Sequence, residues 1–275
     1  MMRRSPLRSV RSLVRAILLF VIAIAYAFPI LYMAFSSFKR EQDIAPPSLT
    51  FAPTLDNYKA VVSDELFKHL VNSVAITTSS VVLALVLALA IAYTIVHGKL
   101  RKPLTHYNWY ITTTLLPAVA VIMPIYLILN WMHLLDSPGA LIALYTAAGV
   151  PLMVWMCATY MLDIPQSIIE AAQIDGCTRW QSFYRVILPI IKGGLVSTSL
   201  LVFILTWNEF LFAVSFTFTR SPTLPVYMNR FMTQQGLFWG KMSAAATIAI
   251  IVPVIFGFVA QKSLIKGLLS GAVKE

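Results

Sequence analysis

The chain of 275 residues is too apolar and too weakly charged to be a soluble domain. Apolar residues make up 59% of it and charged residues 12%, whereas a soluble domain carries about a quarter charged residues. The net charge of +10 suggests nucleic acid, but the basic residues cluster at the ends of apolar runs, which excludes that partner and indicates a lipid bilayer as solvent.

Six apolar runs reach the roughly 20 residues that a membrane-spanning helix needs. We therefore predict an all-α, polytopic membrane protein with six transmembrane helices, at Leu13–Phe35, Val71–Val96, Trp109–Leu129, Ala140–Leu162, Gly193–Phe218 and Met242–Ala260. Four arginines precede the first run and a fifth, Arg15, lies at its start, as in a signal peptide. The run is longer than the roughly 7–15 apolar residues of a signal-peptide core, so a retained helix is expected.

The basic residues predict the orientation of these helices. With the N-terminus inside, 14 of the 21 Lys and Arg residues lie in inner segments and 7 in outer ones. The positive-inside rule then places both termini in the cytoplasm. The expected organisation is a basic cytoplasmic N-terminus over residues 1–12, a transmembrane domain over 13–263 and a cytoplasmic tail over 264–275.

Prolines lie inside several predicted spans, at Pro117, Pro124, Pro151 and Pro253. Each removes a backbone donor and is expected to kink its helix. The kinks serve either packing or a gating hinge. Cys157 lies in an apolar run and Cys177 in a polar loop, so we expect neither a disulfide nor a metal site.

The inner loop over residues 163–190, named the coupling loop below, predicts two short helices. Pro165 suits the first turn of a helix, and Gly176 suits its left-handed end. Thr178 and Gln181 have the spacing of a capping box that starts a second helix. Trp180, Phe183 and Ile187 recur at helical spacing and predict an apolar face on that helix. Pro189 is expected to end the pair.

The first of these helices carries small residues, Ala171 and Ala172, and is followed by Gly176. Small side chains let another backbone approach closely, so the helix and turn could form a docking surface. An ordinary interfacial loop helix explains the same pattern, and the residues alone leave both interpretations open.

The coupling loop also resembles a known motif. Glu170-Ala171-Ala172, Asp175-Gly176, Phe183 and Leu188-Pro189 are similar to the EAA motif of permease subunits of binding-protein-dependent ABC importers. The resemblance implies that Glu170, Ala171, Ala172, Asp175 and Gly176 form a coupling helix in a groove of an ATPase subunit. The chain departs from the motif at Cys177, where alanine is usual, and lacks a second proline after Pro189.

Further segments resemble the carbohydrate-uptake branch of this family, and within it the second maltose-permease subunit. These are Ser37-Phe38-Lys39, Pro46-Pro47, Asn57-Tyr58, Asn72-Ser73, Trp207-Asn208-Glu209-Phe210 and Ser270-Gly271-Ala272-Val273-Lys274. The resemblance runs nearly from end to end. It implies that the tail residues Ser270, Gly271 and Lys274 contact the ATPase dimer, although a frayed terminus is the alternative.

Glu209 is the only carboxylate within a predicted span. A buried charge in a bilayer costs about 2.5–3.5 kcal/mol or more, so such residues usually face a cavity. One interpretation is that Glu209, Asn208 and Trp207 line a solute path. The carboxylate and amide would then form hydrogen bonds with sugar hydroxyls, and the Trp207 ring would stack on the sugar. The other is a structural hydrogen bond between helices.

The resemblance implies a permease subunit that imports a sugar or sugar-like solute across the bacterial or archaeal cytoplasmic membrane. Its partners would be a second permease subunit, an ATPase dimer and an extracytoplasmic binding protein.

No Walker loop or hydrolase motif is present, so the chain is not expected to be an enzyme or to bind a cofactor. ATP and Mg would be bound by the ATPase. A proton-coupled secondary transporter is the alternative, but it would need more intramembrane ionisable groups than Glu209. The solute itself stays open among maltose-like sugars, trehalose, polyols and glycerol phosphate esters.

Overall fold

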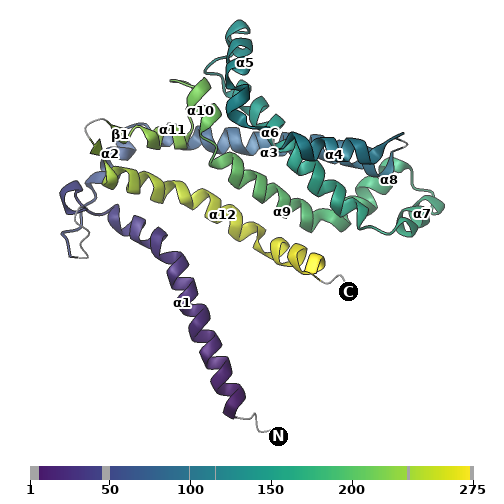
Figure 1. The fold of residues 1–275 in the computed structure, drawn as a ribbon, viewed down its shortest axis with the longest axis horizontal. Helices are drawn as coiled ribbons and strands as arrows, with labels where there is room; N and C mark the ends of the chain where they lie inside the picture. Colours follow the sequence, from purple (N-terminus) through teal and green to yellow (C-terminus); the bar gives the residue numbers. More distant parts are fainter. Residues whose placement is uncertain (1–5, 45–49, 99, 115, 234–235, 273–275) are drawn as a thin grey trace. The chain divides into compact units, whose positions relative to one another are not determined.

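The computed structural model describes residues 6–44, 50–98, 100–114, 116–233 and 236–272. These residues are mostly helical, as predicted (Figure 1). The elements are α1 (Pro6–Ser36), η1 (Glu41–Asp43), α2 (Asp56–Ser63), α3 (Leu66–His97), α4 (Pro103–Thr113), α5 (Ala118–Trp131), α6 (Pro138–Leu162), α7 (Gln166–Ile174), α8 (Arg179–Ser182), the π-helical η2 (Phe183–Ile187), α9 (Leu188–Trp207), α10 (Leu211–Phe216), α11 (Leu224–Asn229), β1 (Met232–Thr233), β2 (Gly236–Leu237) and α12 (Trp239–Ala272). β1 and β2 pair antiparallel as a small hairpin.

Five of the described helices are long and apolar enough to cross a membrane, and a sixth span results if the bent pair α4 and α5 crosses as one. The prediction of a polytopic helical membrane protein is therefore confirmed. The third predicted span, Trp109–Leu129, was expected to be one helix. Instead α4 ends at Thr113, α5 begins at Ala118, and the two are bent by 90°. Pro117 immediately precedes α5 and lacks the N–H that a continuous helix would use there.

The fifth predicted span, Gly193–Phe218, differs at both ends. The helix begins earlier and runs from Arg179 through η2 to Trp207, so the prediction that Pro189 ends the short helices is wrong. In η2 the Leu188 N–H bonds the Phe183 carbonyl, five residues back. This wider turn stands directly before Pro189, which has no N–H to continue the backbone ladder, and the chain runs on into α9. At the other end α10 is a separate short helix.

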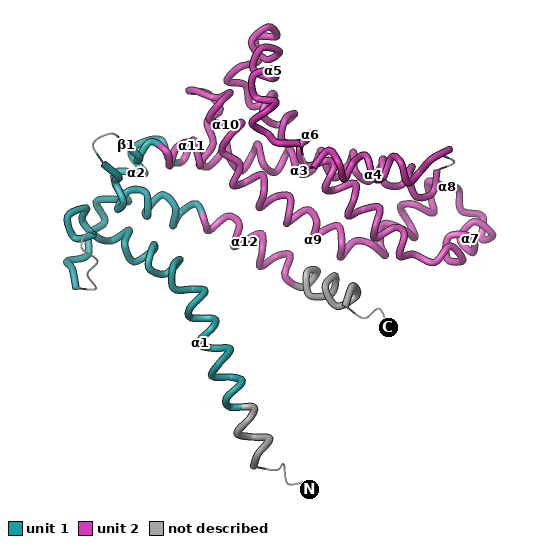
Figure 2. Tube along the Cα trace, viewed as in Figure 1, with its two compact units in different colours: residues 1–66, 230–249 teal, residues 67–229, 250–275 magenta. Residues whose placement is uncertain are grey.

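The chain divides into two compact units, coloured in Figure 2. Unit 2 comprises residues 67–229 and 250–275, and α6 and α9 pack against each other within it. Along α3, Ser80, Ala84, Ala88 and Ala92 are buried at intervals of four residues, which is the small-residue spacing typical of close membrane-helix packing. A Cβ atom added at Gly194 would lie 2.5 Å from the Tyr160 ring, so α9 requires glycine there to approach α6.

Unit 1 comprises residues 1–66 and 230–249. The Asn57 side chain donates to the carbonyls of Ser37 and Lys39 at 2.9 and 2.7 Å. Lys39 is fully buried, and its Nζ lies 5.2–5.3 Å from the ring centroids of Tyr32, Phe35 and Phe51. The carboxylate of Glu41 accepts the first N–H groups of α12, from Trp239 and Gly240, and so caps the positive end of that helix.

Candidate functional site

The coupling loop starts both helices that its local chemistry predicts. α7 is a separate short helix, whereas α8 continues through η2 into α9. Pro165 directly precedes α7 instead of starting it. Gly176 ends the helix at φ +87°, a left-handed conformation suited to glycine. The Thr178 hydroxyl accepts the Gln181 N–H at 3.2 Å, and the Gln181 side chain accepts the Thr178 N–H at 2.8 Å. The reciprocal pair satisfies backbone donors that the start of α8 leaves open.

One face of α7 packs inward and the other is free. Ile169 and Ala172 are buried within the chain, so Ala172 supports the helix instead of presenting a small surface. The exposed face carries Ser167, Glu170, Ala171 and Ile174, at positions i, i+3, i+4 and i+7 of one helical stripe. Ile174 is 86% exposed, the largest exposed fraction among the large hydrophobic side chains of the described chain. The sequence interpretation missed Ile174, although its spacing from Glu170 and Ala171 was a usable signal.

The inner side of the coupling loop packs on aromatic rings. Trp180 stacks on Phe183 with ring centroids 5.4 Å apart. Phe183 and Ile187 are buried, while Trp180 is exposed, so the predicted apolar face is only partly internal. Tyr93, near the end of α3, meets the Phe183 ring at 5.1 Å and donates its hydroxyl to the Arg179 carbonyl at 3.2 Å. Sequence reasoning gave no signal for Tyr93.

Glu209 lies between α9 and α10 and bridges elements that are distant in sequence. Its Oε2 accepts the Tyr145 hydroxyl of α6 at 2.6 Å. The N–H groups of Phe212 and Ala213 donate to the same carboxylate at 2.9 and 3.3 Å. A carboxylate at the N-terminus of α10 also faces the positive end of that helix, and it explains why a new helix starts here. The bonding matches the structural interpretation, and a role in a solute path stays a prediction.

The neighbours of Glu209 differ in exposure. Trp207 is 5% exposed and stacks on Phe203 at 5.8 Å, so its ring face is covered by its own chain. Phe203 stacks in turn on Phe256 of α12 at 4.2 Å. Asn208 is exposed, and its amide donates back to the Ile204 carbonyl at 2.8 Å. Of the three predicted solute-path residues, only Asn208 and Glu209 therefore offer polar atoms to a path.

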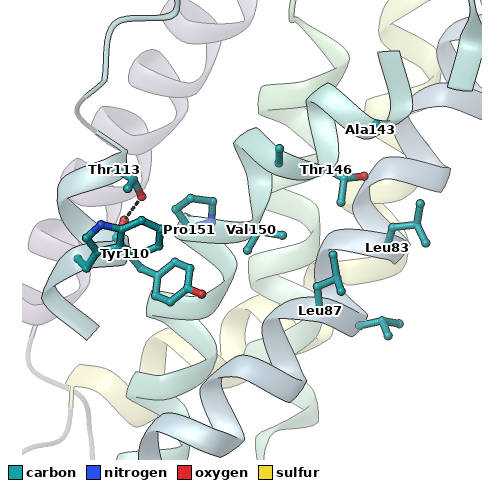
Figure 3. A pocket seen from close by; sticks show the side chains of 11 residues that line it. Leu83, Leu87, Tyr110, Thr113, Ala143, Thr146, Val150 and Pro151 are labelled. Atoms are coloured by element: carbon teal, nitrogen blue, oxygen red, sulfur yellow. Dashed lines mark hydrogen bonds between the residues drawn. The ribbon is translucent and has the colours of Figure 1, made fainter. Parts of the chain in front are cut away.

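A separate pocket of about 640 Å³ opens between α3, α4 and α6 (Figure 3). It is lined by Leu83, Val86, Leu87, Trp109, Tyr110, Thr113, Ala143, Thr146, Ala147, Val150 and Pro151. This lining is almost wholly apolar and offers few partners for the hydroxyl groups of a sugar. None of the predicted solute-path residues lines this pocket.

A carboxylate also organises the 217–224 segment, which lies at the opposite end of unit 2 from α7 (Figure 1). Asp136 accepts the backbone N–H groups of residues 218–221 and the hydroxyls of Thr219 and Ser221, at 2.9–3.2 Å. Desolvation opposes ionisation of this carboxyl, but the four backbone donors outweigh it and hold the pKa of Asp136 well below its ordinary range. Asp136 itself has a positive φ of 55°.

The predicted tail residues are described only in part. Ser270 and Gly271 lie in the last turn of α12, so the helix extends further than predicted. Lys274 lies outside the described residues. The structure thus brings the α7 residues together on one loop, and Asn208 and Glu209 together between α9 and α10.

Comparison with known proteins identifies relatives along nearly the whole chain. A probable ABC transporter permease protein of Sinorhizobium fredii is 34% identical, over 97% of each chain. The diacetylchitobiose uptake system permease protein of Streptomyces coelicolor is 32% identical, over 99% of this chain and 100% of its own. The trehalose/maltose transport system permease protein of Thermococcus litoralis is 31% identical, over 99% of both.

The fold has a counterpart among solved structures. A chain from a bacterial ABC transporter involved in the import of the acidic polysaccharide alginate matches with a TM-score of 0.73, over 95% of this chain and 99% of that one, at 22% identity. The family model for the binding-protein-dependent transport system inner membrane component matches residues 80–269, more than half of the chain. The chain therefore belongs to the family of inner membrane components of binding-protein-dependent transport systems.

Proposed function

We propose that the chain is a permease subunit that translocates a sugar or sugar-like solute delivered by an extracytoplasmic binding protein, with ATP hydrolysed by a separate subunit. Family membership supports the transport system. Two relatives named for oligosaccharide or disaccharide uptake support the solute class. The sugar-uptake segments around Asn57, Asn72 and Glu209 support the same class.

The proposed orientation places both termini in the cytoplasm of a bacterial or archaeal cell. The excess of Lys and Arg in the segments on the same side as the N-terminus supports this choice. It puts α7 and α8 in the cytoplasm and the 217–224 segment on the outside. Residues 1–12 and 264–275 then flank a transmembrane permease domain over residues 13–263.

The exposed face of α7 is the observation that carries the proposed coupling. Glu170 and Ala171 lie beside an isoleucine that is 86% exposed, and Asp175 and Gly176 follow at the turn. An apolar side chain of that size gains about 1.5–3 kcal/mol when a partner covers it. We propose that α7 inserts into a groove of one ATPase subunit, which holds ATP and Mg, and that a second permease subunit completes the transporter.

Ala171→Trp tests this docking in the transporter purified with its partner subunits. The indole would push the exposed face of α7 off its groove, so the ATPase subunit should be lost from the complex while membrane insertion is unchanged. Gln173→Trp is the matched control, because Gln173 is exposed on the same helix but lies about 160° around the helix axis from Ala171. Wild-type retention of the ATPase by Ala171→Trp would refute the docking.

The proposed tail contact has a separate test. Deleting residues 270–275 should change the basal or stimulated rate of ATP hydrolysis if Ser270, Gly271 and Lys274 contact the ATPase dimer. An unchanged rate would show that the tail is idle, as expected of a frayed terminus.

A further inference from the structure

The helix α3 differs from the other long helices in lacking residues at which helices commonly bend, namely proline and glycine. Its 32 residues contain neither proline nor glycine. The other candidate spans are interrupted by such residues, namely Pro29 in α1, Pro124 in α5, Pro151 in α6, Pro189 and Gly193 in α9, and Pro253 in α12. Sharp bends in helices occur mostly at proline, at Gly/Ser pairs, at π-helical turns or where a side chain inserts into the backbone ladder. In α3 the Ser80 hydroxyl donates to the Ile76 carbonyl one turn back at 2.7 Å, but no proline removes a backbone donor. α3 is therefore the span best suited to move as one rigid piece.

One end of α3 is attached to the coupling loop. The Tyr93 hydroxyl donates to the carbonyl of Arg179, the first residue of α8, at 3.2 Å. The Tyr93 ring lies edge-on to Phe183 at 5.1 Å, and Phe183 is buried beneath the stacked Trp180. Tyr93 therefore links α3 to the same loop that presents α7.

The other end of α3 is attached to the 217–224 segment. The Asn72 amide donates to the carbonyls of Arg220 and Pro222 at 3.1 and 3.3 Å. The Ser73 hydroxyl accepts the Leu224 N–H at 2.7 Å. His69 Nδ1 lies 3.1 Å from the Pro222 carbonyl oxygen. One turn of α3 thus holds the backbone of this segment at several atoms.

We propose that Tyr93 is a positioning residue through which the coupling loop moves α3, and that α3 carries this movement to the 217–224 segment. The inference rests on the proposed docking of α7 to an ATPase subunit. A loop displaced by nucleotide binding pulls on Tyr93 through one hydrogen bond and one ring contact. Because α3 has no proline or glycine hinge, its opposite end follows, and the segment bonded to Asn72 and Ser73 moves with it.

A thiol probe at Arg220 measures this transmission without any solute. Arg220 is exposed, and its backbone is bonded to both Asp136 and Asn72. In the complete transporter, Arg220→Cys is combined with Cys177→Ala, because Cys177 is partly exposed, whereas Cys157 is buried. The rate of reaction with a maleimide is compared between the nucleotide-free state and the state trapped with ATP and vanadate.

We expect the two states to differ in labelling rate in this background. Tyr93→Phe removes one neutral hydrogen bond, so the ratio of the labelling rates in the two states should move toward one by about two- to tenfold. Tyr93→Ala also removes the ring contact and should bring this ratio to one. The ATPase subunit should stay bound in both variants. Tyr107→Phe is the control, because the bond of the Tyr107 hydroxyl to Thr159, at 3.3 Å, joins α4 to α6 and not to α3.

A wild-type rate ratio in Tyr93→Ala would overturn the proposal, as would equal rates in the two states of the background. If Tyr93→Ala fails to assemble, Asn72→Ala combined with Ser73→Ala tests the other end of α3, because it removes the Asn72 and Ser73 bonds to the segment. The ratio should then fall toward one, and a wild-type ratio would overturn the proposal. The docking proposal has its own test: it fails if the Ala171→Trp variant retains the ATPase subunit. That result does not depend on residue 93.

Discussion

The two polar turns at opposite ends of unit 2 are held in different ways. The turn between α7 and α8 satisfies its backbone locally, through the Thr178–Gln181 capping box and bonds between residues at most five apart. The 217–224 segment is held by Asp136, Asn72 and Ser73, which lie about 80 to 150 residues away in sequence. The first arrangement leaves side chains free for a partner, whereas the second fixes a segment to the body of the protein.

Asp136→Ala should have the largest effect, because it removes the main attachment of the 217–224 segment and leaves the turn between α7 and α8 unchanged. It leaves four backbone N–H groups and two hydroxyls without their acceptor, and we expect the free energy for local opening of residues 218–221 to fall by about 2–4 kcal/mol. Amide hydrogen exchange of the reconstituted complex measures this loss. Asp136→Asn is the control, because asparagine tolerates the positive φ and keeps one acceptor oxygen, so exchange should rise less. Equal protection in wild type and Asp136→Ala would remove the distinction between the two turns.

Glu209 should behave as a second long-range attachment. Glu209→Ala leaves the Tyr145 hydroxyl and the start of α10 unsatisfied, which should lower the amount of assembled complex at a cost of about 1–3 kcal/mol. Glu209→Gln keeps an acceptor and should lose less. Uptake per assembled complex separates the two roles: a selective loss in Glu209→Ala indicates solute contact, and wild-type uptake per complex would remove Glu209 from the solute path.

Thr178→Ala should act on the α7–α8 turn alone. Loss of an N-cap hydroxyl typically costs a helix about 1 kcal/mol, so exchange should rise at the start of α8 and stay unchanged in residues 218–221. Thr178→Ser keeps the hydroxyl and is the control. Faster exchange of both turns in Thr178→Ala would contradict the view that the first turn is locally stabilised.

Acidification should leave the Asp136 contact intact over a wide range. The pKa of Asp136 is depressed in the folded protein, so its stabilising contribution is complete above the ordinary aspartate pKa of about 3.9. It is lost only as the pH falls from there toward the depressed pKa. Protection of residues 218–221, corrected for the intrinsic exchange rate, should therefore stay constant from pH 7 to about pH 4.5. A loss within that range would show that other groups control the segment.

The difference between the two turns also explains what the sequence could predict. Gly176, Thr178 and Gln181 act on neighbours within a few residues, so their spacing predicted the turn and the start of α8. Asp136 and Tyr145 act on partners that only the packed helices bring close, and no local pattern marks them. The separate helix α10 was missed for the same reason, because Glu209 looked like one polar residue in an apolar run. Pro117 predicted a kink, but the surrounding sequence did not predict the size of the bend, which is 90°.

The exposed isoleucine of α7 has a consequence for the life of the subunit before assembly. On the proposed docking and orientation, Ile174 would stand in the cytoplasm before assembly, as an apolar group on a short helix beside a glycine turn. Exposed apolar surface favours association with other exposed apolar surfaces. The residue proposed to join the subunits would thus also leave an unassembled subunit open to non-specific association.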